Sequence, residues 1–341
     1  IQIFLYICLM SFISVKEKLS TPKYKQIILS IEQALLGGTL KKGDQLPSVN
    51  NIRDKFSLSR DTVLKALNEL KTRGIIQSIA GKGYYIINEN INTTQKVFLL
   101  FDELNSFKED LYNAFLSNLD TNTQVDIYFH HFNYDVFSKL IYESIGNYNY
   151  YVIMPANLKQ TNKILEKLPA DKVYILDQTH DELTQYSGIY QPFEKDIFNN
   201  LTKGLDLIKT YQKLILLFQE QKQPQGMLLG FKSFCEQNNL DHEVVNNLQN
   251  RTPKTGEIYL IPDDRNLIVI LKKIKEAQLK LAKDIGIISY NDTILKEIVE
   301  GGITTISTDF NKMGAQLAQM INNKMTLKIE NPSTLILRHS L

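Results

Sequence analysis

Cysteine is scarce in this sequence, which contains only Cys8 and Cys235, far apart in a chain of 341 residues. Two isolated thiols exclude a disulfide framework and match no metal-ligand spacing, so we expect a reducing, cytoplasmic setting. His130 and His131 are adjacent, but no further histidine or cysteine stands at ligand spacing. We therefore predict no metal site.

Long apolar runs are also scarce. Residues 1–15 are uncharged and mostly apolar, but the run lacks a basic n-region and a small-residue cleavage site, and it is too short to span a bilayer. We therefore expect no membrane partner. Residues 1–20 are interpreted as an N-terminal extension that is either not native or disordered, with Met10 as the natural initiator.

Motifs of catalysis and nucleotide binding are missing as well. Gly301 and Gly302 form a turn, because neither a P-loop nor a dinucleotide-binding fingerprint surrounds them. The sequence contains no nucleophile elbow, no Ser-His-Asp order and no paired acid–base motif. We therefore expect no enzymatic activity and no cofactor.

Charge is distributed unevenly along the chain. The composition, with 43% hydrophobic and 22% charged residues, is that of a globular protein long enough for two domains. Residues 16–90 carry 13 Lys and Arg against 7 Asp and Glu, a net charge of +6, whereas the other residues carry 26 against 30, a net of −4. Only the N-terminal part is therefore expected to bind a polyanion.

Residues 21–87 have the pattern of a helix-turn-helix. Ser48 is placed to cap a short helix, and Ser59 to cap a second one with a buried stripe of apolar residues that ends near Gly74. The second helix leaves polar and basic side chains exposed near its N-terminus, where a recognition helix enters the major groove. Two short strands follow, at 75–79 and 84–87, around Gly81, Lys82 and Gly83, which form a tight turn.

These residues resemble the GntR-type winged-helix regulators. The matching segments are Tyr24–Ile27, Gly38–Ser48, Leu58–Val63, Leu67, Leu70, Gly74–Ile76 and Gly81–Gly83. The resemblance implies that Arg60 and Gly81 touch DNA and that Thr62 bonds a phosphate. Asn50 and Leu64 stand where the family commonly has arginine, so Arg53 and Lys65 are expected to supply phosphate contacts. The predicted DNA-binding residues are Ser48, Arg53, Ser59, Arg60, Asp61, Thr62, Lys65, Gly81, Lys82 and Gly83.

After a polar linker at 88–95, short apolar runs alternate with helical stretches from residue 96 to the end of the sequence. Repeated βαβ units predict parallel, doubly wound sheets with a ligand crevice at the carboxyl ends of the strands. This alternation predicts an α/β fold for residues 96–341. Helices were expected at 107–119, 134–145, 158–168, 192–210, 226–238 and 267–280.

Residues 96–341 resemble the sugar-binding domain of the lac repressor family, itself similar to periplasmic binding proteins of type I, and the resemblance is most specific over residues 258–321. The matching blocks are Ile258–Asp264, Leu281–Asp292, Ile303–Asp309 and Met313–Ala318. The resemblance implies two lobes, one comprising 96–186 and 293–324, the other 187–292 and 325–341. It also implies a small-molecule effector bound between the lobes.

Side chains just past the strand ends are expected to face such a crevice. Carboxylates and amides there can hydrogen-bond sugar hydroxyls, and aromatic rings can stack on a sugar; for each carboxylate or amide, helix capping is the alternative role. Where the family has an arginine that grips ligand oxygens, this chain has Met227, which favours a neutral sugar. The candidates are Asp102, Asn105, Phe107, Asn157, Asp177, Gln219, Asp264, Tyr290, Asn291 and Asp292.

The favoured hypothesis is a homodimeric transcription factor, a repressor of carbohydrate-utilisation genes, that binds an inverted-repeat operator in double-stranded DNA under control of a sugar. One alternative is an enzyme with a GntR-type regulatory head. The other is a constitutive DNA-binding protein with a degenerate cleft.

Overall fold

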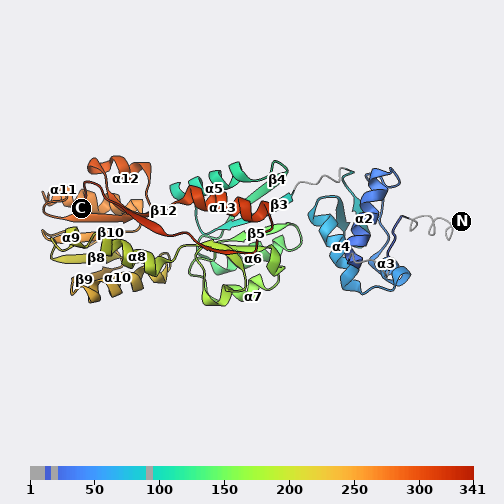
Figure 1. The fold of residues 1–341 in the computed structure, drawn as a ribbon, viewed down its shortest axis with the longest axis horizontal. Helices are drawn as coiled ribbons and strands as arrows, with labels where there is room; N and C mark the ends of the chain where they lie inside the picture. The colour runs from blue at the N-terminus through green and yellow to red at the C-terminus, as the bar shows by residue number, and fades with distance from the viewer. Residues whose placement is uncertain (1–11, 17–21, 90–94) are drawn as a thin grey trace. The chain divides into compact units, whose positions relative to one another are not determined.

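The computed structural model describes residues 12–16, 22–89 and 95–341 (Figure 1). Two compact units form, one from the described parts of Ile1–Leu99 with Asp120–Tyr128 and Lys139–Tyr151, the other from Leu100–Leu119, Phe129–Ser138 and Val152–Leu341. The predicted linker at 88–95 lies largely outside the described residues. The described residues form three sheets, one of two strands and two of six.

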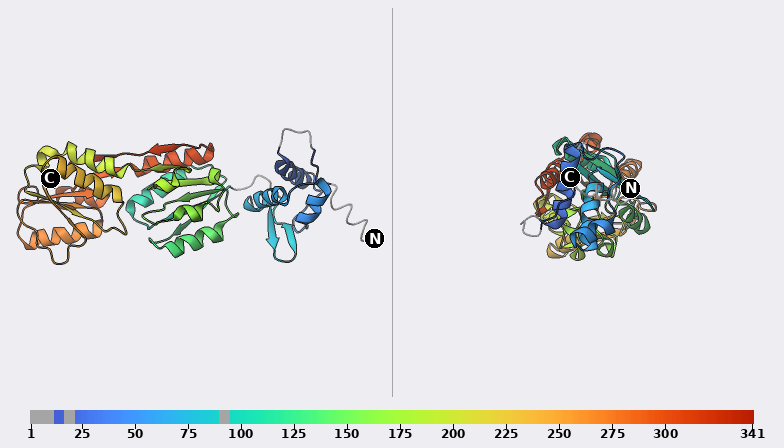
Figure 2. Two further views of the ribbon diagram at one scale, coloured as in Figure 1. Left: turned by 90° about the horizontal axis from the view of Figure 1, so that it is seen from below. Right: turned by 90° about the vertical axis from the view of Figure 1, so that its right-hand side faces the viewer.

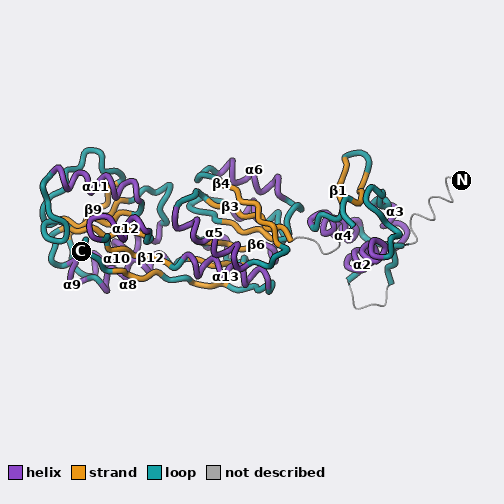
Figure 3. Tube along the Cα trace, turned by 90° about the horizontal axis from the view of Figure 1, so that it is seen from above, coloured by secondary structure: helices purple, strands orange, loops and turns teal. Residues whose placement is uncertain are grey.

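The N-terminal part is a winged helix. Its elements are α2 (Lys23–Leu36), α3 (Val49–Phe56), α4 (Arg60–Thr72), β1 (Ile76–Ile79) and β2 (Gly83–Ile86). Ser48 accepts a hydrogen bond from the Asn51 amide at 3.1 Å, and Ser59 accepts one from the Thr62 amide at 3.1 Å, so both predicted caps are confirmed. Figure 3 shows β1 and β2 as a hairpin beside these helices.

One hydrophobic core holds the three helices and the wing together. The predicted stripe of α4 is buried in it, and the base of the wing contributes Ile76 and Ile86. Residues 12–16, which were predicted to lie outside the fold, join this core. Ile13 is 4% exposed, and the Ser14 amide donates to the Ser30 hydroxyl at 3.1 Å. Burial of the Ile13 side chain among apolar residues of this core stabilises the folded state. The prediction that the extension lies outside the fold is therefore wrong for residues 12–16.

The first six-stranded sheet has the order β13-β7-β6-β5-β3-β4. Its strands are β3 (Gln95–Phe101), β4 (Thr123–Phe129), β5 (Tyr150–Ile153), β6 (Val173–Asp177), β7 (Ser187–Tyr190) and β13 (Lys328–Glu330). The helices between and beside them are α5 (Ser106–Asn118), α6 (Tyr134–Ser144), α7 (Thr161–Leu165) and α13 (Phe310–Asn322), with short 3-10 turns at Ala170–Lys172 and Asp181–Leu183. α13 packs along α5.

The second six-stranded sheet has the order β14-β12-β11-β10-β8-β9, parallel except for β14. Its strands are β8 (Lys213–Leu217), β9 (Asp241–Val245), β10 (Glu257–Ile261), β11 (Gly286–Tyr290), β12 (Thr304–Thr308) and β14 (Ser333–Ile336). Its helices are α8 (Phe193–Lys203), α9 (Leu205–Ile208), α10 (Gln225–Gln237), α11 (Asp264–Glu276) and α12 (Ile294–Ile298), the last followed by a 3-10 turn at Val299–Gly301.

Alternation along the strands buries both faces of this second sheet. Leu214 and Leu216 of β8 pack with α8 and α10, whereas Ile215 and Leu217 pack with α11. A period of two sends successive side chains to opposite faces, which explains why these strands are continuous apolar runs. Helices cover both faces (Figure 2). The predicted doubly wound α/β fold is confirmed.

The predicted lobe boundaries need correction at three strands. Residues 187–190 form β7 and residues 328–330 form β13, and both strands pair within the first sheet rather than the second. Residues 304–308 form β12 of the second sheet rather than part of the first lobe. The cause is that tertiary strand pairing decides which sheet a strand joins, and a local apolar pattern does not encode that pairing.

Two predicted helices also differ. The stretch 192–210 is two helices, because α8 ends at Gly204, whose missing side chain leaves room for Leu335 of β14. The stretch 158–168 contains only the short α7, preceded by Gln160 in a left-handed conformation. The helix α12 and the strand β13 were not predicted.

Replacing Gly230 by alanine is expected to destabilise the fold. A Cβ at this position of α10 would meet the Glu194 carbonyl oxygen of α8. Overpacking of this kind costs about 1–3 kcal/mol, more than the roughly 1 kcal/mol that alanine gains in helix propensity. Chemical denaturation should show this loss, whereas Ser233→Ala on the exposed face of α10 serves as the control and should change little. Equal stability of the two variants would contradict the close packing of α8 and α10.

Candidate DNA-binding and effector sites

The N-terminal end of α4 presents a set of polar groups to solvent. Arg60 and Asp61 are exposed in its first turn, next to the Ser59 cap. The Ser59 and Thr62 hydroxyls lie 2.8 Å apart, which fixes both side chains at the helix end. A helix N-terminus attracts anions through its free amides and its dipole, so this end suits a phosphate backbone with Arg60 reaching beyond it.

Two of the predicted basic residues have contacts within the winged helix. The Lys65 amine lies 4.3 Å from the centre of the Tyr24 ring, a cation–π contact that holds an exposed lysine beside α2. Arg53 pairs with the neighbouring Asp54 at 2.7 Å. The Asp54 carboxylate offsets the charge of Arg53, so Arg53 contributes less to a positive surface than its sequence position suggested.

The wing turn requires its glycines and is tied to the body of the domain. Gly81 and Gly83 have φ of 72° and 104°, which side-chain-bearing residues rarely adopt. The Gln45 side-chain amide donates to the Lys82 carbonyl at 2.6 Å, so the backbone of the turn is fixed. The exposed Lys82 therefore projects from a rigid support, as a phosphate contact requires.

A cavity of about 580 Å³ lies within the second compact unit and is lined by residues that follow strands of both six-stranded sheets. Its size is that of pockets for small molecules. Eight of the ten predicted effector residues line it, which supports the strand-end argument. They are Asp102, Asn105, Phe107, Asp177, Gln219, Asp264, Tyr290 and Asn291.

One wall of the cavity carries a relay of hydrogen bonds. The Tyr290 hydroxyl donates to Gln191 Oε1 at 3.1 Å, and Gln191 Nε2 donates to Asp177 Oδ1 at 2.5 Å. Burial raises the pKa of the Asp177 carboxyl and raises that of Tyr290 well above its ordinary value. Nearby, the buried Lys108 amine is ion-paired with Asp102. Carboxyl and amide oxygens therefore dominate this wall.

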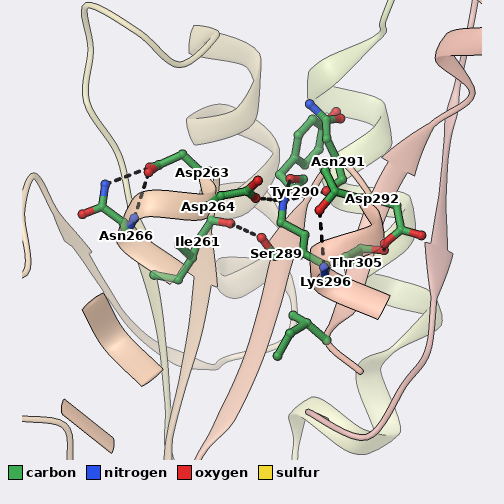
Figure 4. A network of polar contacts seen from close by, with 12 residues as sticks. Ile261, Asp263, Asp264, Asn266, Ser289, Tyr290, Asn291, Asp292, Lys296 and Thr305 are labelled. Carbon is green, nitrogen blue, oxygen red and sulfur yellow. Dashed lines mark hydrogen bonds and ion pairs between the residues drawn. The ribbon is translucent and has the colours of Figure 1, made fainter. Parts of the chain in front are cut away.

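A second group of lining residues is organised by a buried lysine (Figure 4). Lys296 is 1% exposed, and its amine contacts Asp264 Oδ1 at 3.0 Å and the carbonyls of Tyr290 and Asn291 at 2.8 and 2.7 Å. Burial lowers the pKa of Lys296, and the Asp264 charge opposes that shift. Asn291 is 7% exposed, yet its Oδ1 accepts no hydrogen bond. A buried acceptor without a hydrogen-bond partner lowers the stability of the folded state, so Asn291 Oδ1 is a candidate to accept a hydrogen bond from a ligand.

Asn157 and Asp292, also predicted, do not line the cavity. Asn157 Nδ2 donates to the carbonyls of Glu220 and Gln223 at 2.8 and 2.6 Å, so it joins two loops. Asp292 forms a two-point ion pair with Arg338, both contacts at 2.7 Å. Although burial acts to raise it, Arg338 holds the pKa of Asp292 below its ordinary value. The structure gives both residues structural partners instead of a place at the cavity.

Several of the other predicted residues have a second role. Asn105 caps α5 by accepting from the Lys108 amide at 3.2 Å, as the capping alternative anticipated. Phe107 packs against Phe310 with ring centres 4.8 Å apart, and Gln219 donates to the Asn246 carbonyl at 3.3 Å. Each still borders the cavity, so capping or packing and ligand contact are compatible here.

Sequence reasoning missed Lys108, Gln191 and Lys296, which organise the cavity walls. Gln191 directly follows β7, so the strand-end rule would have found it. Lys108 stands in the first turn of α5, and its partner Asp102 lies in the chain before the helix begins. For Lys296 the sequence carries no signal, because a lysine in a helix is ordinarily solvent-exposed.

Among the described residues, no helix is both long and apolar enough to cross a bilayer. Within the same ranges, no group of three His, Cys, Asp or Glu side chains is placed to hold a metal ion.

Two family models match the chain. Residues 23–86 match the bacterial regulatory proteins of the gntR family, which covers the winged helix. Residues 209–341 match the periplasmic binding protein-like domain, which covers the second six-stranded sheet.

Two relatives among characterised proteins match this chain, one over 29% of its length and the other over 90%. The HTH-type transcriptional repressor YtrA of Bacillus subtilis (strain 168) is 38% identical over 99 residues, which cover 29% of this chain and 72% of that protein. The arabinose metabolism transcriptional repressor of Geobacillus stearothermophilus is 23% identical over 342 residues, which cover 90% of this chain and 92% of that repressor.

Solved structures show the same fold in the C-terminal part. The lac repressor dimer bound to operator and the anti-inducer ONPF has a TM-score of 0.60 at 14% identity, covering 73% of this chain and 94% of that one. With the winged helix matched by family model and by a relative covered over most of its length, this chain belongs to the GntR family of bacterial regulatory proteins and carries a periplasmic-binding-protein-like domain in its C-terminal part.

Proposed function

We propose that this regulator is a homodimeric repressor that acts in the cytoplasm and binds an inverted-repeat operator under control of a neutral sugar. The observation that carries the proposal is the cavity with its unpartnered Asn291 acceptor, present in the same chain as a winged helix. A cavity lined by polar side chains favours a ligand-controlled regulator over a constitutive DNA-binding protein with a degenerate cleft. An operator with two-fold symmetry has two half-sites, and a dimer supplies one winged helix for each of them.

The cavity walls favour a ligand rich in hydrogen-bond donors. The buried cations Lys108 and Lys296 are already paired with Asp102 and Asp264. Met227 lines the cavity and is 1% exposed, at the position where an arginine was expected for an anionic effector. The rings of Phe107 and Tyr290 border the same space. Sugar hydroxyls match the acceptors, and the apolar face of a sugar ring matches the aromatic groups.

The relatives support this class of effector without identifying it. The Geobacillus stearothermophilus relative is a repressor of arabinose metabolism, so arabinose stands first in a test panel. Purified protein is screened by thermal unfolding against neutral mono- and disaccharides. An effector at 100 times its dissociation constant stabilises the folded state by about 2.7 kcal/mol. No shift with any sugar would favour a degenerate cleft, and turnover of a sugar would favour an enzyme.

Replacing Lys82 by alanine is expected to weaken binding to all duplex sequences alike. An exposed lysine at the wing tip contacts phosphate rather than bases, so its loss lowers affinity without changing base preference. In a salt titration, the slope of log affinity against log salt concentration should fall by about 1. Lys272→Ala, which removes the same charge from the exposed surface of α11, is the control. An unchanged slope for Lys82→Ala would remove the wing from the proposed interface.

A further inference from the structure

Lys296 lines the cavity, but protein acceptors occupy all the hydrogen-bond donors of its ammonium group. The side chain is 1% exposed. Its amine meets Asp264 Oδ1 at 3.0 Å and the carbonyl oxygens of Tyr290 and Asn291 at 2.8 and 2.7 Å. An ammonium group has three N–H donors, so these three acceptors saturate it. Lys296 therefore has no donor left for a ligand.

The three acceptors belong to residues that line the cavity (Figure 4). Two of them are the main-chain carbonyls of Tyr290 and Asn291. Asn291 has φ of 60°, in the left-handed region, which Asn adopts more readily than most residues with side chains. The same Asn291 side chain carries the buried Oδ1 without a partner. The third acceptor is the Asp264 carboxylate at the start of α11.

We propose that Lys296 is a positioning residue for effector binding, which holds the Asn291 backbone and the Asp264 carboxylate in the arrangement that receives the sugar. This inference rests on the proposed function, since it assigns a role in sugar recognition to a residue whose amine has no donor left for the sugar. Lys296 acts through Asn291 and Asp264 alone.

A neighbouring ion pair supplies a matched control. Arg338 holds Asp292, the residue after Asn291, through two contacts at 2.7 Å, but neither residue lines the cavity. Both pairs fix the same short segment after β11. If Lys296 served only the stability of the fold, removing either cation would affect ligand binding to a similar degree.

The experiment compares Lys296→Met and Arg338→Met with the wild type. The probe is whichever of L-arabinose, D-glucose and trehalose gives the wild type its largest thermal shift, and its affinity is measured by calorimetry at a temperature where all proteins are folded. Losing hydrogen bonds that orient a buried acceptor is expected to weaken binding by tenfold or more for Lys296→Met, and by less than twofold for Arg338→Met. Lys296→Gln, which keeps one donor, is expected to fall between Lys296→Met and the wild type, and replaces Lys296→Met if that variant does not fold.

Wild-type affinity in Lys296→Met, or equal losses in the two variants, would overturn the proposal. If the wild type binds none of the three sugars, the proposed sugar effector fails, and hydrogen exchange of the unliganded proteins then tests Lys296 alone. Amides of residues 290–296 should exchange at least about tenfold faster in Lys296→Met than in Arg338→Met. Equal exchange in the two variants would show that Lys296 does not position this segment.

Discussion

Arg60→Ala is expected to weaken binding to the operator by about 1–3 kcal/mol and to relax base preference, because a well-placed arginine contributes that much discrimination at a base edge. Arg60 is exposed at the start of α4, where the Ser59 cap fixes the helix end. A duplex selected from a random pool serves as operator, and its affinity is compared with that of a random duplex. The ratio of the two affinities is expected to fall.

The control removes the same charge from the other end of the same helix. Lys71 stands in the last turn of α4, and Lys71→Ala should lower affinity for both duplexes slightly while leaving their ratio unchanged. An unchanged ratio for Arg60→Ala would exclude base reading by this residue. A drop in both affinities by the same factor would reduce Arg60 to a phosphate contact.

Asn291→Ala is expected to weaken sugar binding, and so to reduce the response at a given sugar concentration, while leaving sugar-free operator binding intact. The Oδ1 atom of Asn291 is a buried acceptor without a protein partner, so a sugar hydroxyl that fills this place is bonded in the complex. Removing a polar partner in a buried contact costs about 1–3 kcal/mol, and the methyl group of alanine leaves a void beside the sugar as well. Calorimetry of sugar binding and operator titrations with and without sugar measure the two effects.

Asn250→Ala is the control for this variant. Asn250 is exposed, follows β9 and does not line the cavity, so its loss should leave sugar affinity unchanged. If Asn291→Ala bound sugar as tightly as Asn250→Ala, the acceptor would be satisfied by something other than the effector. The proposed contact between the Asn291 side chain and the sugar would then be wrong.

The winged helix could be predicted almost completely from the sequence. Ser48 and Ser59 mark helix starts because a hydroxyl satisfies a free amide locally, and the glycines of the wing mark a backbone conformation that other residues avoid. These interactions span only a few residues, so a local pattern contains them. Ile13 was missed because nothing local distinguishes a residue that packs on a distant helix from an apolar segment outside the fold.

The cavity could be predicted in position but not in its internal bonding. Strand ends of parallel sheets meet at one edge, so the rule placed residues such as Asp177 and Asn291 correctly. The rule does not reveal which partner a side chain takes. Asp292 forms an ion pair with Arg338, 46 residues away in the sequence. This pairing depends on β14, which precedes Arg338, joining the second sheet. The lobe boundaries failed at β7 for a related reason, since β7 pairs with the preceding strand β6 and with the distant β13, and a local pattern does not reveal which sheet a strand joins.

The central claim is that sugar in the cavity controls how tightly the winged helices hold DNA. The most direct measurement is an operator titration of the full chain by fluorescence anisotropy, at fixed salt, with and without the sugar that stabilises the protein. We expect a change in operator affinity in the wild type, typically 5- to 150-fold for coupled sites, and in Asn291→Ala a change that requires a higher sugar concentration. Equal operator affinity with and without a sugar that demonstrably binds the wild type would contradict this claim.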